Sequence, residues 1–146
     1  MKVVIQRVSK ASVSNVHKNE VVGEITKGML VLVGIKKGDT EEKVLQLAQK
    51  LKKLRIFEET EGKMTHSALD LQLPILLVSQ FTLLANTKDG NRPSFLDAEE
   101  PSRAKELYEL LISEVSKDLP VETGSFGEYM NISAELDGPV TIVMEL

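Results

Sequence analysis

Apolar residues along this chain follow two different periods, and each period predicts a different kind of element. Two nearly continuous apolar runs, residues 29–35 and 75–78, are typical of strands buried on both faces of a sheet. Shorter apolar or alternating stretches predict further strands at residues 3–8, 13–16 and 21–25, the last two around a polar turn. The chain is therefore expected to begin with a group of strands.

Two helices are predicted from apolar positions spaced three and four residues apart. Asp39 followed by Glu42 resembles a capping box, with Asp39 as the cap of the first helix. Pro101 suits the first turn of the second helix. The apolar stripes are Val44, Leu47, Ala48, Leu51 and Leu54 in the first helix, and Ala104, Leu107, Tyr108, Leu111, Ile112 and Val115 in the second. We interpret the second stripe as core and not as a cofactor site.

The end of the chain alternates between apolar and polar residues at 130–136 and again at 140–146, which predicts two strands. Asp137-Gly138 between them is typical of a hairpin turn, and Pro139 is tolerated as the first residue of an edge strand. Strands grouped at both ends, with two main helices between them, predict an α+β fold. We expect a single domain over residues 1–146, with a mixed, largely antiparallel and barrel-like sheet.

Composition excludes several kinds of chemistry. The chain has no cysteine, which rules out disulfides, thiolate zinc sites and a cysteine nucleophile, and its two histidines belong to no metal-binding motif. A P-loop and a Gly-x-Gly-x-x-Gly motif are also absent, so we expect neither a metal nor an organic cofactor. No apolar run approaches the ~20 residues of a membrane span, and the N-terminus becomes polar too soon for a signal peptide. We expect a cytoplasmic protein without a membrane partner.

The net charge of −4 limits the nucleic-acid contact that is expected. Proteins that hold long stretches of phosphate usually carry a basic face. The charge leaves two interpretations, a small footprint at the end of an RNA or an acidic enzyme with no nucleic-acid partner. Charge alone favours the second interpretation.

The segment Ser79-Gln80-Phe81-Thr82 follows the apolar run at 75–78, and polar residues at the end of a buried strand are well placed to line a site. A serine or threonine nucleophile normally needs an adjacent base. The sequence identifies none, because His66 in a predicted loop is more typical of a surface residue. The pattern argues against a side-chain triad. The alternative is a strand end whose hydroxyls only satisfy local hydrogen bonds.

Four segments together resemble the D-aminoacyl-tRNA deacylases, or D-tyrosyl-tRNA deacylases, from the first strand to the last residues. They are Ile5-Gln6-Arg7-Val8, Ser79-Gln80-Phe81-Thr82, Asn91-Arg92-Pro93-Ser94-Phe95 and Asp137-Gly138-Pro139-Val140-Thr141. The resemblance implies a D-aminoacyl-tRNA deacylase-like fold and hydrolysis of the ester that links a D-amino acid to tRNA. It also implies hydrolysis of mischarged glycyl-tRNA, rejection of L-aminoacyl-tRNA, and no cofactor.

The resemblance implies catalytic roles for four neighbouring residues. Ser79 and Gln80 would line the pocket for the terminal nucleotide, and the backbone amides of Phe81 and Thr82 would face the reacting carbonyl. Two backbone N–H groups suffice to stabilise an oxyanion, and the free 2′-hydroxyl of the same ribose would help to position or activate water. The alternative is that the Thr82 hydroxyl is the attacking group.

The resemblance places substrate selection at Gly138-Pro139. In deacylases of this type the Gly-Pro peptide is cis and enters the active site of the other subunit, which implies a homodimer. Backbone carbonyls there would hold the amino group and leave room for a side chain on the D side only. Arg7 would brace this segment, and Arg92 is a candidate contact for tRNA phosphate.

Two positions depart from the family pattern, since relatives usually have Asn where this chain has Leu136 and Thr65. Leu136 bears on how the Gly-Pro segment is anchored. Two rival functions are a synthetase-associated editing module, against which the lack of any linker or fused domain argues, and a non-catalytic RNA-end-binding or DNA-binding protein. Hydrolysis of D-aminoacyl-tRNA by the purified chain would separate the enzyme from the second rival.

Overall fold

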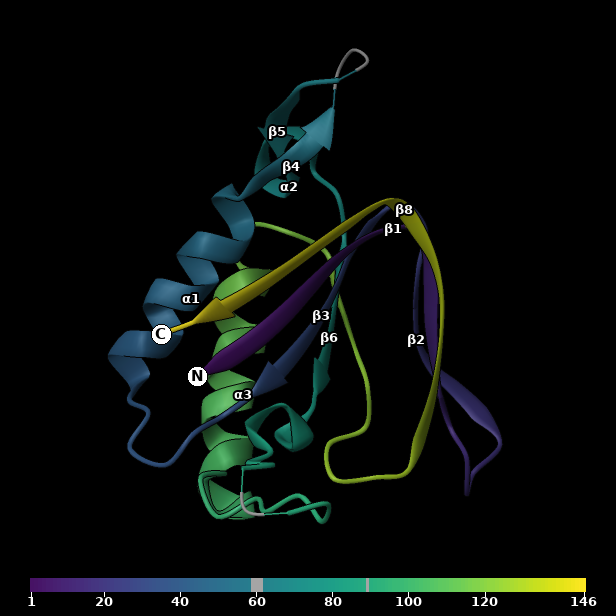
Figure 1. Cartoon of the computed structure of the whole chain (residues 1–146). Coiled ribbons are helices and arrows are strands. Elements are labelled where there is room, and N and C mark those ends of the chain that lie inside the picture. The colour runs from purple at the N-terminus through teal and green to yellow at the C-terminus, as the bar shows by residue number, and fades with distance from the viewer. Residues whose placement is uncertain (59–61, 89) are drawn as a thin grey trace.

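The computed structural model describes residues 1–58, 62–88 and 90–146, and shows a curved sheet packed against two long helices (Figure 1). The strands are β1 (Lys2–Asn15), β2 (Glu20–Ile25), β3 (Gly28–Gly34), β4 (Arg55–Glu58), β5 (Met64–Ser67), β6 (Ile75–Ser79), β7 (Val121–Thr123) and β8 (Met130–Glu145). The helices are α1 (Glu41–Lys53), α2 (Ala68–Leu71), the 3-10 helix η1 (Phe81–Leu84) and α3 (Pro101–Ser116). The predicted α+β class, with two main helices, is confirmed.

The main sheet has the order β2-β1-β3-β6-β7, and β8 pairs with β1. Strand β1 pairs antiparallel with β2, β3 and β8, whereas β6 runs parallel to both β3 and β7. The sheet is therefore mixed and largely antiparallel, and it curls into a nearly closed barrel, as the sequence predicts. Strands β4 and β5 form a separate two-stranded sheet.

Strands β1 and β8 are longer than the sequence pattern suggests. The predicted strands at 3–8 and 13–16 are halves of β1, and those at 130–136 and 140–146 are halves of β8. The prediction of a hairpin turn at Asp137-Gly138 is wrong, because the chain continues in one direction and both halves of β8 pair with β1. The register shifts between Gln6 and Lys10 of β1, opposite the Gly138-Pro139 peptide, which is cis.

The cap of α1 also differs from the prediction. Its N-cap is Thr40, whose Oγ1 accepts a hydrogen bond from the Lys43 amide at 3.4 Å. The Asp39 side chain is buried instead, and it accepts hydrogen bonds from the Met1 amino group at 2.9 Å and from the Lys36 amide at 2.7 Å. The capping box with Asp39 as cap is therefore wrong, because this carboxylate holds the start of β1 against the end of β3.

The core lies between the sheet and the helices, and α3 crosses behind β1 and β8 in Figure 1. The predicted apolar stripes supply much of it, including Leu47 and Leu51 of α1 and Leu107 and Leu111 of α3. A second cluster fills the curl of the sheet and includes Val8, Val13 and Val78. No helix in the described ranges is long and apolar enough to cross a membrane.

Strand β6 brings the candidate residues to the surface. Its residues Ile75 to Val78 are fully buried, as the continuous apolar run predicts, and burial ends at Ser79. The chain then turns into η1 where the sheet meets the N-terminal end of α3. The buried strand therefore fixes the position of the polar segment that follows it.

Candidate active site

The polar segment after β6 forms one wall of a cavity of about 590 Å³. The opposite walls come from the beginning of α3, with Pro101 and Ala104, and from the segment that leads into β8. The lining residues of that segment are Phe126, Gly127, Glu128, Tyr129, Met130 and Ile132. The cavity is therefore lined by all four residues Ser79 to Thr82 and by residues that lie far from them in the sequence.

The backbone of the segment leaves two N–H groups without a partner in the described part of the chain. The Gln80 amide donates to the Val33 carbonyl oxygen of β3 at 2.8 Å. The Leu83 amide donates back to the Gln80 carbonyl oxygen at 3.2 Å, which closes the first turn of η1. The amides of Phe81 and Thr82 lie inside that turn, where a helix has no acceptor for them, and no described residue accepts from them.

The side chains of the segment show no nucleophile paired with a base. Gln80 Nε2 donates to Thr82 Oγ1 at 2.5 Å, so an amide holds this hydroxyl. Neither Ser79 nor Thr82 is hydrogen-bonded to a histidine or carboxylate among the described residues. His66 lies in β5 and does not line the cavity. The geometry therefore offers no side-chain triad here.

Phe81 is more than half exposed, and its ring meets the ring of Phe95 edge-on, with centroids 5.1 Å apart. This contact ties η1 to the segment that follows it. The segment is closed by paired backbone hydrogen bonds between Asn86 and Ser94, at 2.8 and 2.9 Å. Arg92 is exposed within it, has no ion pair with a described residue, and does not line the cavity.

Arg7 is buried on β1 and is held by several acceptors. Its Nε donates to the Asp137 carbonyl oxygen at 3.2 Å and pairs with Asp137 Oδ2 at 3.1 Å. Its Nη1 donates to the Ile56 carbonyl oxygen at 2.8 Å and contacts Glu58 Oε1 at 3.3 Å. These bonds compensate a charge that would be costly to bury alone. They also fix the backbone beside Gly138.

The Gly138-Pro139 peptide does not line the cavity of its own chain. Gly138 has φ 120°, a region that favours glycine. A Cβ placed on it would lie 2.9 Å from Val140 Cγ2 and 3.1 Å from Arg7 Nη2. Within one chain, the two predicted halves of the site are therefore separate.

The residues 126–132 on the far wall of the cavity were missed by sequence reasoning. They carry no periodic pattern until β8 begins, and neither Glu128 nor Tyr129 belongs to a motif. The nearest available signal is the aromatic pair Phe126 and Tyr129 beside Gly127 in a polar stretch, which is too common to assign. In the described ranges, no three histidine or acidic side chains are grouped closely enough to hold a metal ion.

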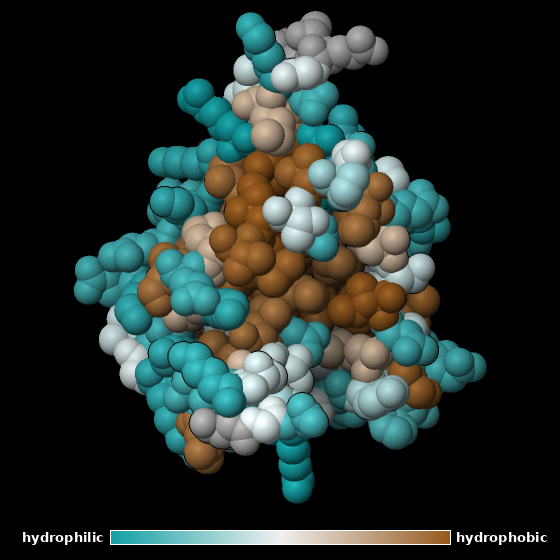
Figure 2. All heavy atoms as spheres, in the orientation of Figure 1, coloured by the Kyte–Doolittle hydropathy of each residue, from teal (hydrophilic) through white to brown (hydrophobic). Residues whose placement is uncertain are grey.

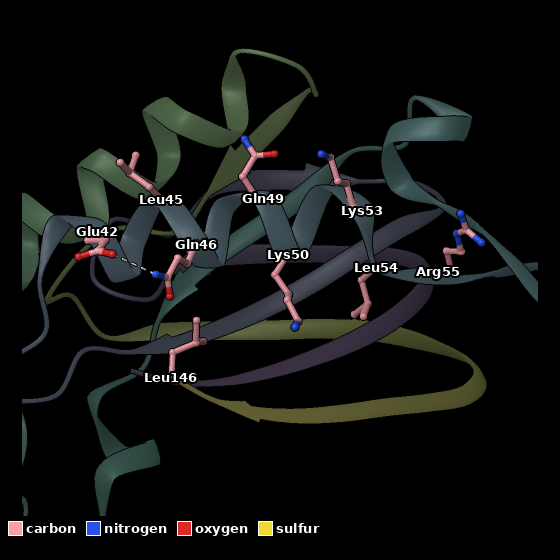
Figure 3. A pocket seen from close by; sticks show the side chains of 9 residues that line it. All are labelled: Glu42, Leu45, Gln46, Gln49, Lys50, Lys53, Leu54, Arg55 and Leu146. Atoms are coloured by element: carbon pink, nitrogen blue, oxygen red, sulfur yellow. Dashed lines mark hydrogen bonds between the residues drawn. The ribbon is translucent and has the colours of Figure 1, made fainter.

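A second hollow of about 790 Å³ runs along α1 (Figure 3). Its lining residues are Glu42, Leu45, Gln46, Gln49, Lys50, Lys53, Leu54, Arg55 and Leu146. Figure 3 shows polar side chains from α1 above and the apolar Leu54 and Leu146 beside β8. None of these residues has a hydroxyl, so the cavity at Ser79 to Thr82 is the candidate active site.

Comparison with known proteins identifies the class. A family model described as D-Tyr-tRNA(Tyr) deacylase matches residues 4–145. The chain is 53% identical over 147 residues to a D-aminoacyl-tRNA deacylase of Lactobacillus gasseri, covering 100% of both chains. It is 51% identical to the D-aminoacyl-tRNA deacylase of Aquifex aeolicus, covering 99% of this chain and 97% of the relative. The chain belongs to the D-Tyr-tRNA(Tyr) deacylase family, as its motifs predict.

Solved structures agree with this fold. The structure titled "c-Myc DNA Unwinding Element Binding Protein" superposes with a TM-score of 0.92 and 37% sequence identity, covering 100% of this chain and 99% of the other. A probable eukaryotic D-amino acid tRNA deacylase superposes with a TM-score of 0.84, covering 99% of this chain and 98% of the other. Because that second protein is only 18% identical, it supports the fold alone.

Proposed function

We propose that this protein hydrolyses the ester bond of D-aminoacyl-tRNA in the cytoplasm and releases the free D-amino acid and the tRNA. One observation carries the proposal, namely the two neighbouring backbone N–H groups of Phe81 and Thr82 at the wall of the cavity. Membership of the deacylase family supports it. The cavity binds the acceptor end of the aminoacyl-tRNA, with Ser79 and Gln80 against the terminal nucleotide.

Attack on an ester carbonyl places negative charge on the carbonyl oxygen. The amides of Phe81 and Thr82 act as the oxyanion hole, because both stand on a turn that the Gln80–Val33 hydrogen bond fixes to the sheet. Donors fixed in this way need no reorganisation when the charge develops. The chemistry therefore depends on backbone geometry more than on a side-chain nucleophile.

The attacking water is positioned by the free 2′-hydroxyl of the terminal ribose. The water adds to the carbonyl carbon to give a tetrahedral intermediate. Collapse of this intermediate breaks the bond to the ribose oxygen. The proton that the water gives up goes to this oxygen, which leaves as a hydroxyl of the tRNA. The proposal needs no metal or organic cofactor. We assign the Thr82 hydroxyl to substrate binding, because it accepts from the Gln80 side-chain amide and has no base beside it among the described residues.

Thr82→Ala tests this assignment because it removes the hydroxyl and keeps the backbone N–H. We expect kcat to fall by less than about 10-fold, whereas loss of a catalytic serine costs about 10⁶-fold in a serine protease. Single-turnover deacylation of D-aminoacyl-tRNA measures the effect. A folded Thr82→Ala protein with only background activity would establish Thr82 as the nucleophile.

Chiral selection is proposed to come from Gly138-Pro139 of the other subunit of a homodimer. Its carbonyls hold the amino group of the substrate, and Arg7 braces it through Asp137. Two features support a second subunit at this place. Among the described strands β8 pairs with β1 alone, so one of its edges is open. Strand β8 also exposes Leu136 and Val143.

The surface around β8 fits an interface between subunits. Figure 2 shows apolar side chains gathered across the middle of the face on which β1 and β8 lie in front in Figure 1. Val140, Ile142 and Met144 of β8 remain only partly buried although they pack against the core. A contiguous apolar surface of this kind often marks a protein–protein contact. The two halves of the site would then meet across the dimer.

Hydrolysis of glycyl-tRNA is expected from the same mechanism of chiral selection. Glycine has no side chain on either the D or the L side, so a filter that leaves room on the D side admits it. Arg92, which is exposed without an ion pair to a described residue, is proposed to contact a phosphate of the tRNA. With a net charge of −4, contacts of this kind are confined to the acceptor end.

Deacylation of matched substrates is the direct test of the proposed function. D- and L-forms of one aminoacyl-tRNA, with the same side chain and the same tRNA, are incubated with the purified chain. We expect the D ester to be hydrolysed, the L ester to decay at its spontaneous rate, and glycyl-tRNA to be cleaved. EDTA should leave the rate unchanged. Equal treatment of the D and L esters contradicts the proposal, and activity lost on chelation and restored by zinc contradicts its metal-free form.

Nucleic-acid binding without catalysis is the second candidate, since a similar solved structure has a title that names a DNA-element-binding protein. The same assay separates the two functions. In the presence of a non-catalytic protein, D-aminoacyl-tRNA is hydrolysed at its spontaneous rate, whatever the affinity of the protein for nucleic acid. The acidic composition favours the enzyme, because binding of duplex phosphate draws on lysine and arginine.

A further inference from the structure

Tyr108 of α3 connects parts of the molecule that belong to three walls of the cavity. Its side chain is buried with 2% of the residue exposed, and its hydroxyl donates to the Leu77 carbonyl oxygen of β6 at 2.7 Å. Burial raises the pKa of this hydroxyl, and the nearby backbone N–H of Ser79 partly offsets that rise. The ring packs against Phe126, with centroids 5.8 Å apart. Ala104, one turn earlier on α3, lines the cavity itself.

The hydroxyl of Tyr108 bonds to β6 at the point where β7 stops pairing with it. Strand β7 pairs with β6 only as far as Leu77 and Thr123, and the Gly124 amide makes the last bond, to the Leu77 carbonyl oxygen at 3.1 Å. Beyond Gly124 the chain leaves β6 and forms the far wall of the cavity. The next donor on that edge of β6 is the Ser79 amide, because backbone groups alternate between the two edges and the Gln80 amide faces β3.

A buried N–H without an acceptor is costly, and loss of the last strand bond would loosen the end of β6. The tyrosine hydroxyl holds the end of β6 by donating to the Leu77 carbonyl oxygen, with the Ser79 N–H close to it. Burial raises the pKa of the Tyr108 hydroxyl, so the phenol stays protonated and keeps its donor role. A phenylalanine would fill the core equally well but would remove the bond to the Leu77 carbonyl oxygen, which would keep only the bond from the Gly124 amide.

We infer that Tyr108 is a positioning residue for the deacylase site, which sets the end of β6 and thereby the amides of Phe81 and Thr82. Tyr108 does not line the cavity, so it acts through Ser79 and through Phe126. The inference rests on the proposed function, since the segment that Tyr108 fixes carries the proposed oxyanion donors. According to this inference, the reaction depends on Tyr108 although this residue lies outside the cavity.

Tyr108→Phe tests the inference because it retains the ring and removes the hydroxyl. We expect kcat for D-aminoacyl-tRNA to fall by about 10-fold or more while KM changes by less than about 2-fold, since misplaced donors affect the transition state more than binding. Val115→Ala is the matched control, because Val115 is fully buried further along α3. It should lower Tm and leave kcat unchanged. A Tyr108→Phe enzyme with the kcat of the unmodified protein overturns the inference.

Amide hydrogen exchange gives a second readout that does not depend on hydrolysis. In the unmodified protein the Ser79 amide should be protected although pairing of β6 with β7 ends at Leu77. In Tyr108→Phe its exchange should be faster by about 10-fold or more, while the Gln80 amide stays protected by Val33. Rapid exchange at Ser79 in the unmodified protein overturns the inference even if the variant does not fold. If the exchange results hold and no deacylation is seen, the proposed function alone has failed.

Discussion

Phe81→Pro is expected to lower kcat for D-aminoacyl-tRNA by about 10²–10³-fold relative to Phe81→Ala, the loss seen when one oxyanion donor is removed. Both variants lose the phenyl ring and its contact with Phe95. Only proline also removes the backbone N–H. Phe81 is the first residue of η1, a position where proline is tolerated. Proline disfavours a helical conformation in the residue before it, and Gln80 is not helical, since it has φ −143° and ψ 80°.

Single-turnover deacylation of the two variants measures the contribution of this N–H. Thermal unfolding and binding of uncharged tRNA serve as controls and should be similar for the two proteins, because neither depends on the oxyanion. If Phe81→Pro and Phe81→Ala hydrolyse D-aminoacyl-tRNA at the same rate, the Phe81 amide is not an oxyanion donor. The reaction would then have to be assigned to another part of the cavity.

Gly138→Ala is expected to lower activity on D-aminoacyl-tRNA by about 100-fold, the effect of a displacement of about 1 Å at a site that positions substrate. The added methyl would lie 2.9 Å from Val140 Cγ2 and 3.1 Å from Arg7 Nη2, so the backbone or Arg7 must move. Gly38→Ala is the matched control. Gly38 has φ 81° and a Cβ there would meet nothing within 4 Å, so Gly38→Ala adds a methyl at a positive φ without the close contact.

The same variant tests whether the Gly-Pro segment acts across a dimer. A heterodimer is prepared from one subunit with Gly138→Ala and one with Gln80→Ala. If the segment serves the neighbouring subunit, one site combines an intact Gln80 with an intact Gly138. About half of the activity per dimer then returns, while each parental homodimer keeps only its reduced activity. A heterodimer as inactive as its parents would show that both residues must come from one chain.

The local pattern of the sequence determined the elements that form from neighbouring residues. The apolar run before Ser79 is buried on both faces in β6, and the stripes that include Leu47 and Leu107 face the core from α1 and α3. These features depend on burial with a fixed period, which a sequence displays directly. The family also followed from the sequence, because its motifs are short and contiguous.

Tertiary structure decided where distant segments compete with a local preference. Asp137-Gly138 has the composition of a hairpin turn, yet pairing with β1 along both halves of β8 outweighs it. Asp39 has the spacing of a helix cap, yet its carboxylate is held by the Met1 amino group and the Lys36 amide. In both cases the outcome depends on groups brought together only by folding.

The candidate active site also has one part that the sequence predicts and one part that only folding brings into place. Residues Ser79 to Thr82 were predicted to line a site because they follow the buried strand β6, and their catalytic roles were predicted from the resemblance to the deacylases. The far wall at residues 126–132 and the contact from Tyr108 were not predicted from the sequence. They come close to Ser79 to Thr82 only because β6 pairs in parallel with β7 and because α3 packs against the sheet. A sequence specifies which groups can make such contacts, whereas folding decides that β7 ends at Thr123 and that the Tyr108 hydroxyl reaches the Leu77 carbonyl oxygen there.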